Sequence, residues 1–588
     1  MNKKIDAIQE KLGSFYSAEG TTFRVWAPEK DNIGLVLYED GESASGVIHH
    51  MIKKNNGVHE SIIRTDLKDK FYCYLVEGQE VTDPYSIASS VNSRRSGIID
   101  LKETDPEGWT DHEKPEARPI CQEVIYELNV KDYSINENSG AYHRGKFLGL
   151  CEEKTKYQGL STGIDHLKEL GVTAVHLMPV YDFFTVDERK EYFHVDENYN
   201  WGYDPELYNV PEGSYGTDPM DPKNRIRELK TMIMKLHKMG IKVILDVVYN
   251  HTYKAEDSNF NILNPDYYYR QDQDGNFSNG SGCGNEMATE RPMVRKFILE
   301  SLIYWLEEYK VDGFRFDLMA LMDKETTRQI RDTLRSYKED VIIYGEPWSG
   351  GKTSLEHNMM TTKEVLSDLG LGMFNDDFRD AIKGDNDGKK KGFSQGNKEY
   401  KLETERGIVG GFLSSPELTI NYVNSHDNLI LYDKIKKLFP EKNGNELIKY
   451  NKFALSILFT SQGIPFIHEG NEFLRSKNMD KNSYKSGNKI NGVDWSLKDK
   501  NIDFYNYVKD LISLRKKYGE FTLGSQEEIK DRIRFLDMKL EENLIAYTIK
   551  RDCPGQYFLV VHNGIQKSST IRAANIDSHL KHWDDMKD

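Results

Sequence analysis

The sequence predicts a (β/α)8 TIM barrel that is preceded by a small β-sandwich and followed by a short β-domain. Three observations lead to this α/β fold class. Short apolar strands alternate with amphipathic helices through most of the chain, which is typical of a parallel sheet covered by helices. Strand patterns dominate instead at both ends of the chain. With 588 residues, the chain exceeds the size at which one core stops growing, so several domains are expected.

The N-terminal part is predicted to form a β-sandwich. Alternating apolar and aromatic residues mark strands at 23–28, 34–39 and 71–78, and turn-rich stretches separate them. The segment 110–120 is polar, contains two prolines and is predicted to be a linker. We therefore assign residues 1–115 to this domain.

A barrel is predicted for residues 116–521. The expected strands are 124–130, 173–180, 242–250, 311–317, 341–348, 420–428 and 464–470. The expected helices include 161–171, 225–240, 293–309, 324–339 and 501–519. About eight strand–helix units over ~400 residues fit a barrel enlarged by loop insertions. A doubly wound open sheet is the competing fold, but no GxGxxG follows an early strand.

The chain returns to strands after residue 521. Strand patterns occur at 532–538, 544–551 and 557–564, and a polar tail without such patterns follows. Residues 522–588 are therefore predicted to form a C-terminal β-domain that is apparently incomplete, either through truncation or because its cap is atypical.

Composition restricts the partners. The chain has 79 basic and 95 acidic residues, a formal net charge of −16. Such a charge repels phosphate backbones and anionic lipid, so we expect neither nucleic acid nor a membrane as partner. The five cysteines are scattered, and the N-terminus has no apolar signal segment, which favours a cytoplasmic location. A monomer or weak homo-oligomer is expected.

Polar residues collect at the C-terminal ends of the predicted barrel strands. Because that face of a barrel carries the catalytic loops, we take these residues as candidate site residues. They are Asp246, Asn250, His251, Arg315, Asp317, Glu346, His426 and Asp427. His251 and His426 are suited to hydrogen-bond sugar hydroxyls.

The carboxylates suit cleavage of a glycosidic bond with retention. Such an enzyme needs an ionised nucleophile and a protonated acid, ~5–5.5 Å apart. On the strand 313–317, the two-residue period places Arg315 and Asp317 on one face, where the guanidinium favours the charged form of Asp317. Other carboxylates and apolar neighbours are expected to raise the pKa of Glu346. Asp427 can stabilise an oxocarbenium-like transition state.

Each candidate also has a structural interpretation. An Arg–Asp pair on a strand is often a structural ion pair, and Glu346, which precedes a proline, fits an ordinary loop acid. Asp246 fits a satisfied polar group that closes a strand, and His426–Asp427 fits a cap or turn. Four such groups at four strand ends make a purely structural explanation of the whole set improbable.

The same strand ends resemble a known family. DVVYNH (246–251), GFRFD (313–317), YGEPW (344–348) and NSHDN (424–428) are similar to the four ordered signature regions of the α-amylase superfamily. The resemblance implies Asp317 as nucleophile, Glu346 as general acid/base and Asp427 as transition-state stabiliser. It also implies that Asp246, His251, Arg315 and His426 shape the subsite for the cleaved glucose.

A finer resemblance is to type I pullulanases, which hydrolyse α-1,6 branch linkages. YNWGYDP (199–205) is similar to their signature, and 208–219, 282–297, 462–475 and 482–495 add to the likeness. By analogy, Tyr203 stacks on the sugar at the cleavage subsite; its structural alternative is a loop tyrosine packed on the barrel rim. The segment 20–39 resembles the starch-binding-type sandwich that precedes the barrel in debranching enzymes.

The resemblance implies a debranching hydrolase acting on pullulan, branched α-glucans and limit dextrins. An isoamylase or glycogen-debranching enzyme is the alternative with the same catalytic groups. A branching transferase and a non-catalytic glycan-binding protein are further alternatives. No cofactor is required; calcium remains possible, with Asn250 where relatives often place a ligand, but the sequence does not support it, so no metal ligand is assigned.

Overall fold

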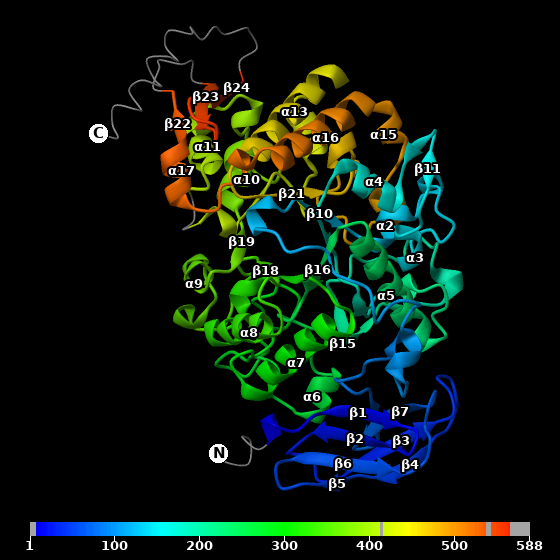
Figure 1. Cartoon of the computed structure of the whole chain (residues 1–588). Coiled ribbons are helices and arrows are strands. Elements are labelled where there is room, and N and C mark those ends of the chain that lie inside the picture. The colour runs from blue at the N-terminus through cyan, green and yellow to red at the C-terminus, as the bar shows by residue number, and fades with distance from the viewer. Residues whose placement is uncertain (1–6, 412–414, 537–542, 565–588) are drawn as a thin grey trace.

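The computed structural model describes residues 7–411, 415–536 and 543–564 (Figure 1). At the N-terminal end, two antiparallel sheets face each other. One has the order β1 (Gly13–Ser17), β2 (Gly20–Trp26), β6 (Val58–Ile63), β5 (Ile52–Lys53). The other has the order β4 (Val47–His50), β3 (Ile33–Tyr38), β7 (Phe71–Val76), β8 (Gln79–Val81), with β9 (Ser96–Gly97) paired to β7. Alternate residues such as Phe23, Leu35 and Tyr72 are buried in one cluster, which confirms the predicted sandwich.

The central part of the chain forms a closed barrel of parallel strands. In order they are β10 (Ile125–Leu128), β13 (Ala174–Leu177), β16 (Lys242–Val247), β17 (Gly313–Phe316), β18 (Ile342–Gly345), β19 (Gly372–Phe374), β20 (Thr419–Tyr422) and β21 (Ile464–His468). The predicted (β/α)8 barrel is therefore confirmed. β19 was not predicted from the sequence, because its three residues give no apolar run long enough to mark a strand.

Helices cover the outside of the barrel, as Figure 1 shows. They include α4 (Gly163–Leu170), α5 (Pro222–Lys238), α7 (Pro292–Glu308), α8 (Lys324–Tyr337), α9 (Lys363–Leu369), α13 (Gly444–Thr460) and α16 (Ile502–Lys517). Local sequence fixes where they begin: the Asp221 side chain accepts the backbone N–H of Lys223 at the start of α5, and Pro222 occupies its first turn. No helix among the described residues is long and apolar enough to cross a membrane.

The C-terminal strands form a three-stranded antiparallel sheet, β22 (Ile533–Phe535), β23 (Leu544–Lys550) and β24 (Tyr557–Asn563). It lies on the far side of the barrel from the sandwich (Figure 1). Tyr547 anchors it by donating its hydroxyl to the carbonyl of Thr460, 3.1 Å away at the end of α13. The predicted polar tail lies outside the described residues, so the incompleteness of this domain stays a prediction, as do the three domain boundaries.

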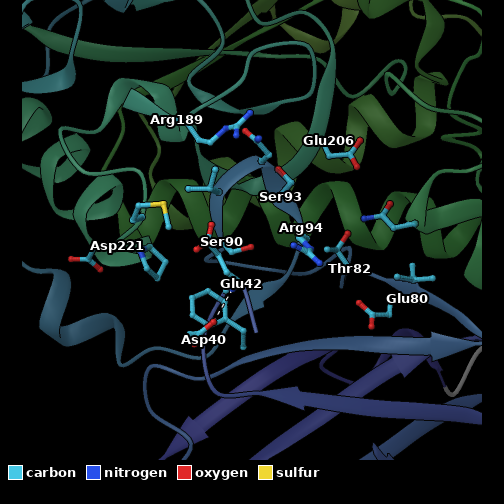
Figure 2. Close-up of a pocket in the computed structure, with 18 of the residues that line it drawn as sticks. Asp40, Glu42, Glu80, Thr82, Ser90, Ser93, Arg94, Arg189, Glu206 and Asp221 are labelled. Carbon is cyan, nitrogen blue, oxygen red and sulfur yellow. Dashed lines mark hydrogen bonds between the residues drawn. The ribbon is translucent and has the colours of Figure 1, made fainter. Parts of the chain in front are cut away.

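The sandwich and the barrel meet along a groove of about 1040 Å³ (Figure 2). Beside it, the loop after the second barrel strand binds the sandwich: the backbone N–H of Asn92 donates to Glu188 over 2.7 Å, and Ser93 donates its hydroxyl to Asp182. Asn92 and Ser93 have φ values of 55° and 54°, a left-handed conformation that disfavours most side chains. These contacts hold that strained turn in place.

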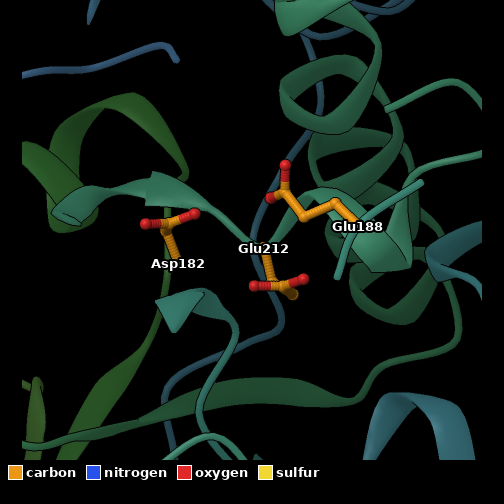
Figure 3. A group of neighbouring side chains, drawn as sticks. All are labelled: Asp182, Glu188 and Glu212. Atoms are coloured by element: carbon orange, nitrogen blue, oxygen red, sulfur yellow. The ribbon is translucent and has the colours of Figure 1, made fainter. Parts of the chain in front are cut away.

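Three buried carboxylates, those of Asp182, Glu188 and Glu212, lie close together next to the barrel (Figure 3). Glu188 forms a two-point ion pair with Arg225, with N–O distances of 2.8 and 2.9 Å, and Asp182 lies 3.9 Å from the same group. Oxygen atoms of Asp182, Glu188 and Glu212 lie within 4.8 Å of one another. Burial, followed by the charge of Glu188, raises the pKa of Asp182 and raises that of Glu212 to about 8.

This cluster should make stability depend on pH. The pKa of Glu212 is higher in the folded chain, about 8, than the ~4.3 of an unfolded chain. The folded state therefore binds the extra proton between these two pKa values, and the free energy of unfolding should fall as pH rises from ~4.3 to about 8. Glu212→Gln, which carries no titrating group, should reduce this fall by roughly 1–3 kcal/mol, measured by denaturant unfolding at pH 5 and pH 9.

The matched control is Glu191→Gln, which changes an exposed glutamate of the same loop region and should leave the pH dependence unaltered. An equal fall for Glu212→Gln and the unmodified chain would show that Glu212 titrates normally in the folded protein.

Candidate active site

The barrel interior has an apolar floor and a polar upper layer. Ile125, Ala174, Ile244, Ile342 and Ile464 belong to one buried apolar cluster inside the barrel. Because alternate residues of a strand point to the same side, polar residues further along these strands face the same interior. Those with a buried polar side chain near the C-terminal ends are Glu127, His176, Asp246, Arg315, Glu346 and His468. The strand register therefore gathers the polar groups on one rim.

Arg315 holds three carboxylates together on that rim. Its Nη1 atom donates to both oxygens of Asp246, at 2.8 and 3.0 Å, and to Asp317 Oδ1 at 3.0 Å. Its Nη2 atom lies 2.6 Å from Glu346 Oε1. The guanidinium thus contacts the predicted nucleophile and the predicted acid at the same time, which fixes their relative positions.

Asp317 directly follows β17 and is fixed from two sides. The Asn250 amide donates to Asp317 Oδ2 over 2.8 Å and to the Asp317 carbonyl over 3.0 Å. Burial, the largest effect, raises the pKa of Asp317 overall. Arg315 and His251 lower it, so the guanidinium favours the charged form as predicted, without cancelling the effect of burial. The side-chain amide of Asn250 therefore serves to position Asp317.

Glu346 follows β18 and is suited to remain protonated. Its Oε2 atom accepts the backbone N–H of Leu318 over 3.1 Å. Burial raises the pKa of Glu346 to about 8, and the charges of Asp317 and Asp427 add to the rise, while Arg315 opposes it. This is the direction that the sequence analysis expected. A carboxylic acid with such a pKa still carries its proton at neutral pH.

Asp427 is the exposed member of the carboxylate set. Its side chain is 50% exposed, and Oδ2 lies 3.7 Å from His426 Nε2. The other ring nitrogen of His426 lies 2.7 Å from Glu127 Oε1, and the pKa of His426 is raised to about 9 by Asp427 and Glu127 against the effect of burial. A protonated His426 can donate a hydrogen bond from Nε2 into the open site.

Tyr203 connects Asp246, which binds Arg315, with His426, which lies beside Asp427. Its hydroxyl donates to Asp246 Oδ2 over 2.6 Å, and its ring stacks on His426 with centroids 5.0 Å apart and planes at 21°. The ring therefore lies beside the catalytic carboxylates, in a position that suits stacking on a sugar. Its role at the cleavage subsite stays a prediction.

His251 is held by protein groups at both ring nitrogens. Nδ1 lies 2.6 Å from Asn250 Oδ1, and Nε2 lies 2.9 Å from the carbonyl oxygen of Tyr203. Burial lowers its pKa. His251 therefore connects Asn250, which holds Asp317, with the backbone at Tyr203. The predicted hydrogen bond from His251 to a sugar hydroxyl would require one of these two contacts to open.

A cavity of about 250 Å³ opens beside the acid. Glu346 and Asp427 line it together with Trp348, Arg379 and Tyr422. Aromatic rings and polar groups around one acid are suited to hold the part of a glycan that leaves during cleavage.

Three residues of the polar layer were not predicted from the sequence: Glu127, His176 and His468. His176 lies 3.1 Å from Asp246 Oδ2, and Glu127 lies 2.8 Å from His468 Nδ1. Each sits inside an otherwise apolar strand, two residues after an apolar position that points into the barrel. A lone polar residue in that register was the signal that could have identified them.

Two protein-family models match this chain. The model of the α-amylase catalytic domain matches residues 149–282 and 277–503. The model of carbohydrate-binding module 48, the isoamylase N-terminal domain, matches residues 11–86. The first match includes every candidate site residue, and the second falls on the sandwich.

Individual relatives are pullulanases and, more distantly, an isoamylase. The pullulanase of Bacillus subtilis is 40% identical over 92% of this chain and 75% of its own length. The crystal structure of Paenibacillus barengoltzii pullulanase in complex with maltohexaose and α-cyclodextrin superposes with a TM-score of 0.92 at 40% identity, covering 96% of this chain and 90% of that chain. Isoamylase 3 of rice is 29% identical over 76% of this chain and 60% of its own length.

The proton on Glu346 can be observed without any substrate. With a pKa of about 8, the protonated carboxyl should give a carbonyl band in the infrared spectrum that persists at pH 7 and disappears above pH 8. The difference spectrum between the unmodified chain and Glu346→Gln isolates this band. Glu356→Gln, at an exposed glutamate of the following loop, should leave it unchanged. A band lost already at pH 5 would mean that Glu346 titrates as an ordinary glutamate.

Proposed function

The chain belongs to the pullulanases of the α-amylase family, and we propose that it hydrolyses α-1,6-glucosidic branch linkages in pullulan, branched α-glucans and limit dextrins. The observation that carries this proposal is the shared guanidinium of Arg315, which places Asp317 and Glu346 side by side on the barrel rim. Two carboxyl groups held in this way, one protonated and one able to ionise, are the requirement for glycoside hydrolysis.

The first step forms a covalent intermediate. Asp317 attacks the anomeric carbon while Glu346 gives its proton to the glycosidic oxygen, so the C1–O6 bond breaks and the branch point leaves with a free hydroxyl. Arg315 contacts both groups and balances the negative charge, which is lost from Asp317 and appears on Glu346 in this step. Tyr203 and His426 are placed to hold the glucose ring, and Asp427 to stabilise its oxocarbenium-like character.

The second step returns the enzyme to its starting state. Glu346, now ionised, takes a proton from water, and the water oxygen attacks the anomeric carbon. The bond to Asp317 breaks, and the sugar is released with its original configuration. Glu346 regains from water the proton that it gave to the glycosidic oxygen in the first step.

Isoamylase-type or glycogen-debranching activity is the alternative. It uses the same catalytic groups, and the sandwich matches a module named for isoamylase. The 40% identity to a pullulanase against 29% to an isoamylase favours the first activity. A branching transferase would pass the intermediate to a sugar hydroxyl, so reducing ends would not accumulate. A non-catalytic binding protein would lack a nucleophile or an acid, and Asp317 and Glu346 are both present.

We also propose a cytoplasmic enzyme that acts on glycogen-derived dextrins, as a monomer or weak homo-oligomer. The cysteines support a reducing compartment: the five are Cys73, Cys121, Cys151, Cys283 and Cys553, and all are free thiols. The net charge of −16 argues against nucleic-acid or anionic-membrane partners.

Pullulan digestion tests the proposed function. The unmodified chain should release maltotriose, because cleavage of every α-1,6 bond in pullulan leaves that unit. Asp317→Ala should lose activity by a factor on the order of 10⁴ or more, since it removes the nucleophile. Products are identified by chromatography. Asp332→Ala, an exposed position on α8, is the matched control and should remain active.

Other outcomes separate the alternatives. Debranching of glycogen or amylopectin without action on pullulan would assign the chain to the isoamylase type. No reaction with any α-glucan would contradict a hydrolase function.

A further inference from the structure

Two aromatic side chains form an exposed stacked pair close to the catalytic rim. Phe184 directly follows β14 (Tyr181–Phe183), and Tyr253 lies two residues after His251. Their ring centroids are 4.7 Å apart with planes at 22°, and the residues are 41% and 46% exposed. Adjacent exposed rings form an apolar patch of the kind that marks a binding surface.

Backbone hydrogen bonds fix this pair to the segment that carries Tyr203. The N–H of Phe184 donates to the carbonyl of Asp204 over 3.0 Å, and the N–H of Tyr253 donates to the carbonyl of Pro205 over 3.1 Å. Tyr203, which precedes these two acceptors, contacts Asp246 on the rim. The pair is therefore held rigidly beside the cleavage subsite, which lowers the conformational entropy that binding would cost.

Charged groups surround the rings. The Lys254 Nζ atom lies 4.1 Å from the Phe184 ring centroid and forms a 2.8 Å ion pair with Glu206. The lysine thereby keeps its position on the ring while its charge is balanced. Rings with fixed hydrogen-bonding groups next to them are suited to a sugar, whose apolar face stacks and whose hydroxyls need polar partners.

The pair is linked to the groove between the sandwich and the barrel through Lys254, which contacts the Phe184 ring and lines the groove. Lys254 and Glu206 line this groove of about 1040 Å³ together with residues of the sandwich. Figure 2 shows Glu206 and Arg189 on the barrel side, Glu42 and Glu80 on the sandwich side, and Arg94 between them. The polar groove thus connects the sandwich, which matches carbohydrate-binding module 48, with the stacked rings.

We propose that Tyr253, supported from behind by Phe184 and Lys254, forms a stacking platform for an α-glucan chain outside the cleavage subsite, and that the groove receives the continuation of that chain. This inference rests on the proposed function, since it adds a binding subsite to the same reaction. The platform holds one arm of the branched substrate through ring stacking, and its effect is on binding, with no part in bond cleavage.

The test is to remove each ring separately. Tyr253→Ala, which removes the ring that stacks on the sugar, and Phe184→Ala, which removes the support of that ring, should each raise the KM for pullulan roughly threefold to tenfold, with kcat within a factor of about two. The affinity for maltohexaose, measured by calorimetry on the unmodified chain and each variant, should fall by a similar factor. Tyr253→Trp, which keeps a ring, should retain most of the affinity.

Tyr337→Ala is the matched control, because this ring is 51% exposed at the end of α8 and does not line the groove. It should change neither quantity. Thermal unfolding of all variants checks that the exposed substitutions leave the fold intact.

The outcomes separate the two proposals. If the unmodified chain cleaves pullulan but both alanine variants keep its KM and its maltohexaose affinity, the platform is wrong and the proposed function stands. A loss of kcat with unchanged KM would also overturn the platform. If the unmodified chain cleaves no α-glucan, the proposed function fails, and the calorimetric comparison still decides whether the rings bind a glucan.

Discussion

The ion pairs of Arg315 are the interaction on which the rest of the site depends. Three carboxylates, those of Asp246, Asp317 and Glu346, lie within hydrogen-bonding distance of its guanidinium in the barrel rim. Removing so many charges from water would cost several kcal/mol per ion without a partner. Two features lower this cost. The positive charge of Arg315 balances part of the negative charge, and Glu346 remains protonated and neutral with a pKa of about 8. The distribution of charge that allows the site to fold is also the one that catalysis requires.

Asp246 extends this arrangement to the side of the site that faces the sugar. It accepts hydrogen bonds from Arg315, His176 and the Tyr203 hydroxyl, and its pKa is lowered by Arg315 against the effect of burial. It therefore stays ionised and serves as a fixed anchor. Through Tyr203 and His426 the anchor reaches Asp427, so that the position of the sugar and the position of the nucleophile are set by one connected network.

Much of the fold and the site could be predicted from the sequence because barrel strands carry a strong local signal. Apolar runs such as 242–250 identified β16, and their polar ends identified Asp246, Asp317 and Glu346. β19 could not be found, since Gly372–Phe374 is too short to form a pattern. His176 and Glu127 are single polar residues within apolar strands, and only the closed barrel shows which pairs meet.

Two further features depend on packing and had no sequence signal. The pKa of Asp317 follows from how deeply the carboxyl is buried, which spacing along the chain does not reveal. Phe184 and Tyr253 are far apart in the sequence, and their stacking arises because both segments bind the backbone next to Tyr203.

The stereochemistry of the released sugar shows whether Asp317 acts as nucleophile. Proton NMR of a pullulan digest, recorded before mutarotation, distinguishes the anomers of the new reducing end. The α-anomer should appear first, since two successive displacements at the anomeric carbon retain the configuration. Initial release of the β-anomer would show that water attacks directly, and would contradict the role assigned to Asp317 and the arrangement around Arg315.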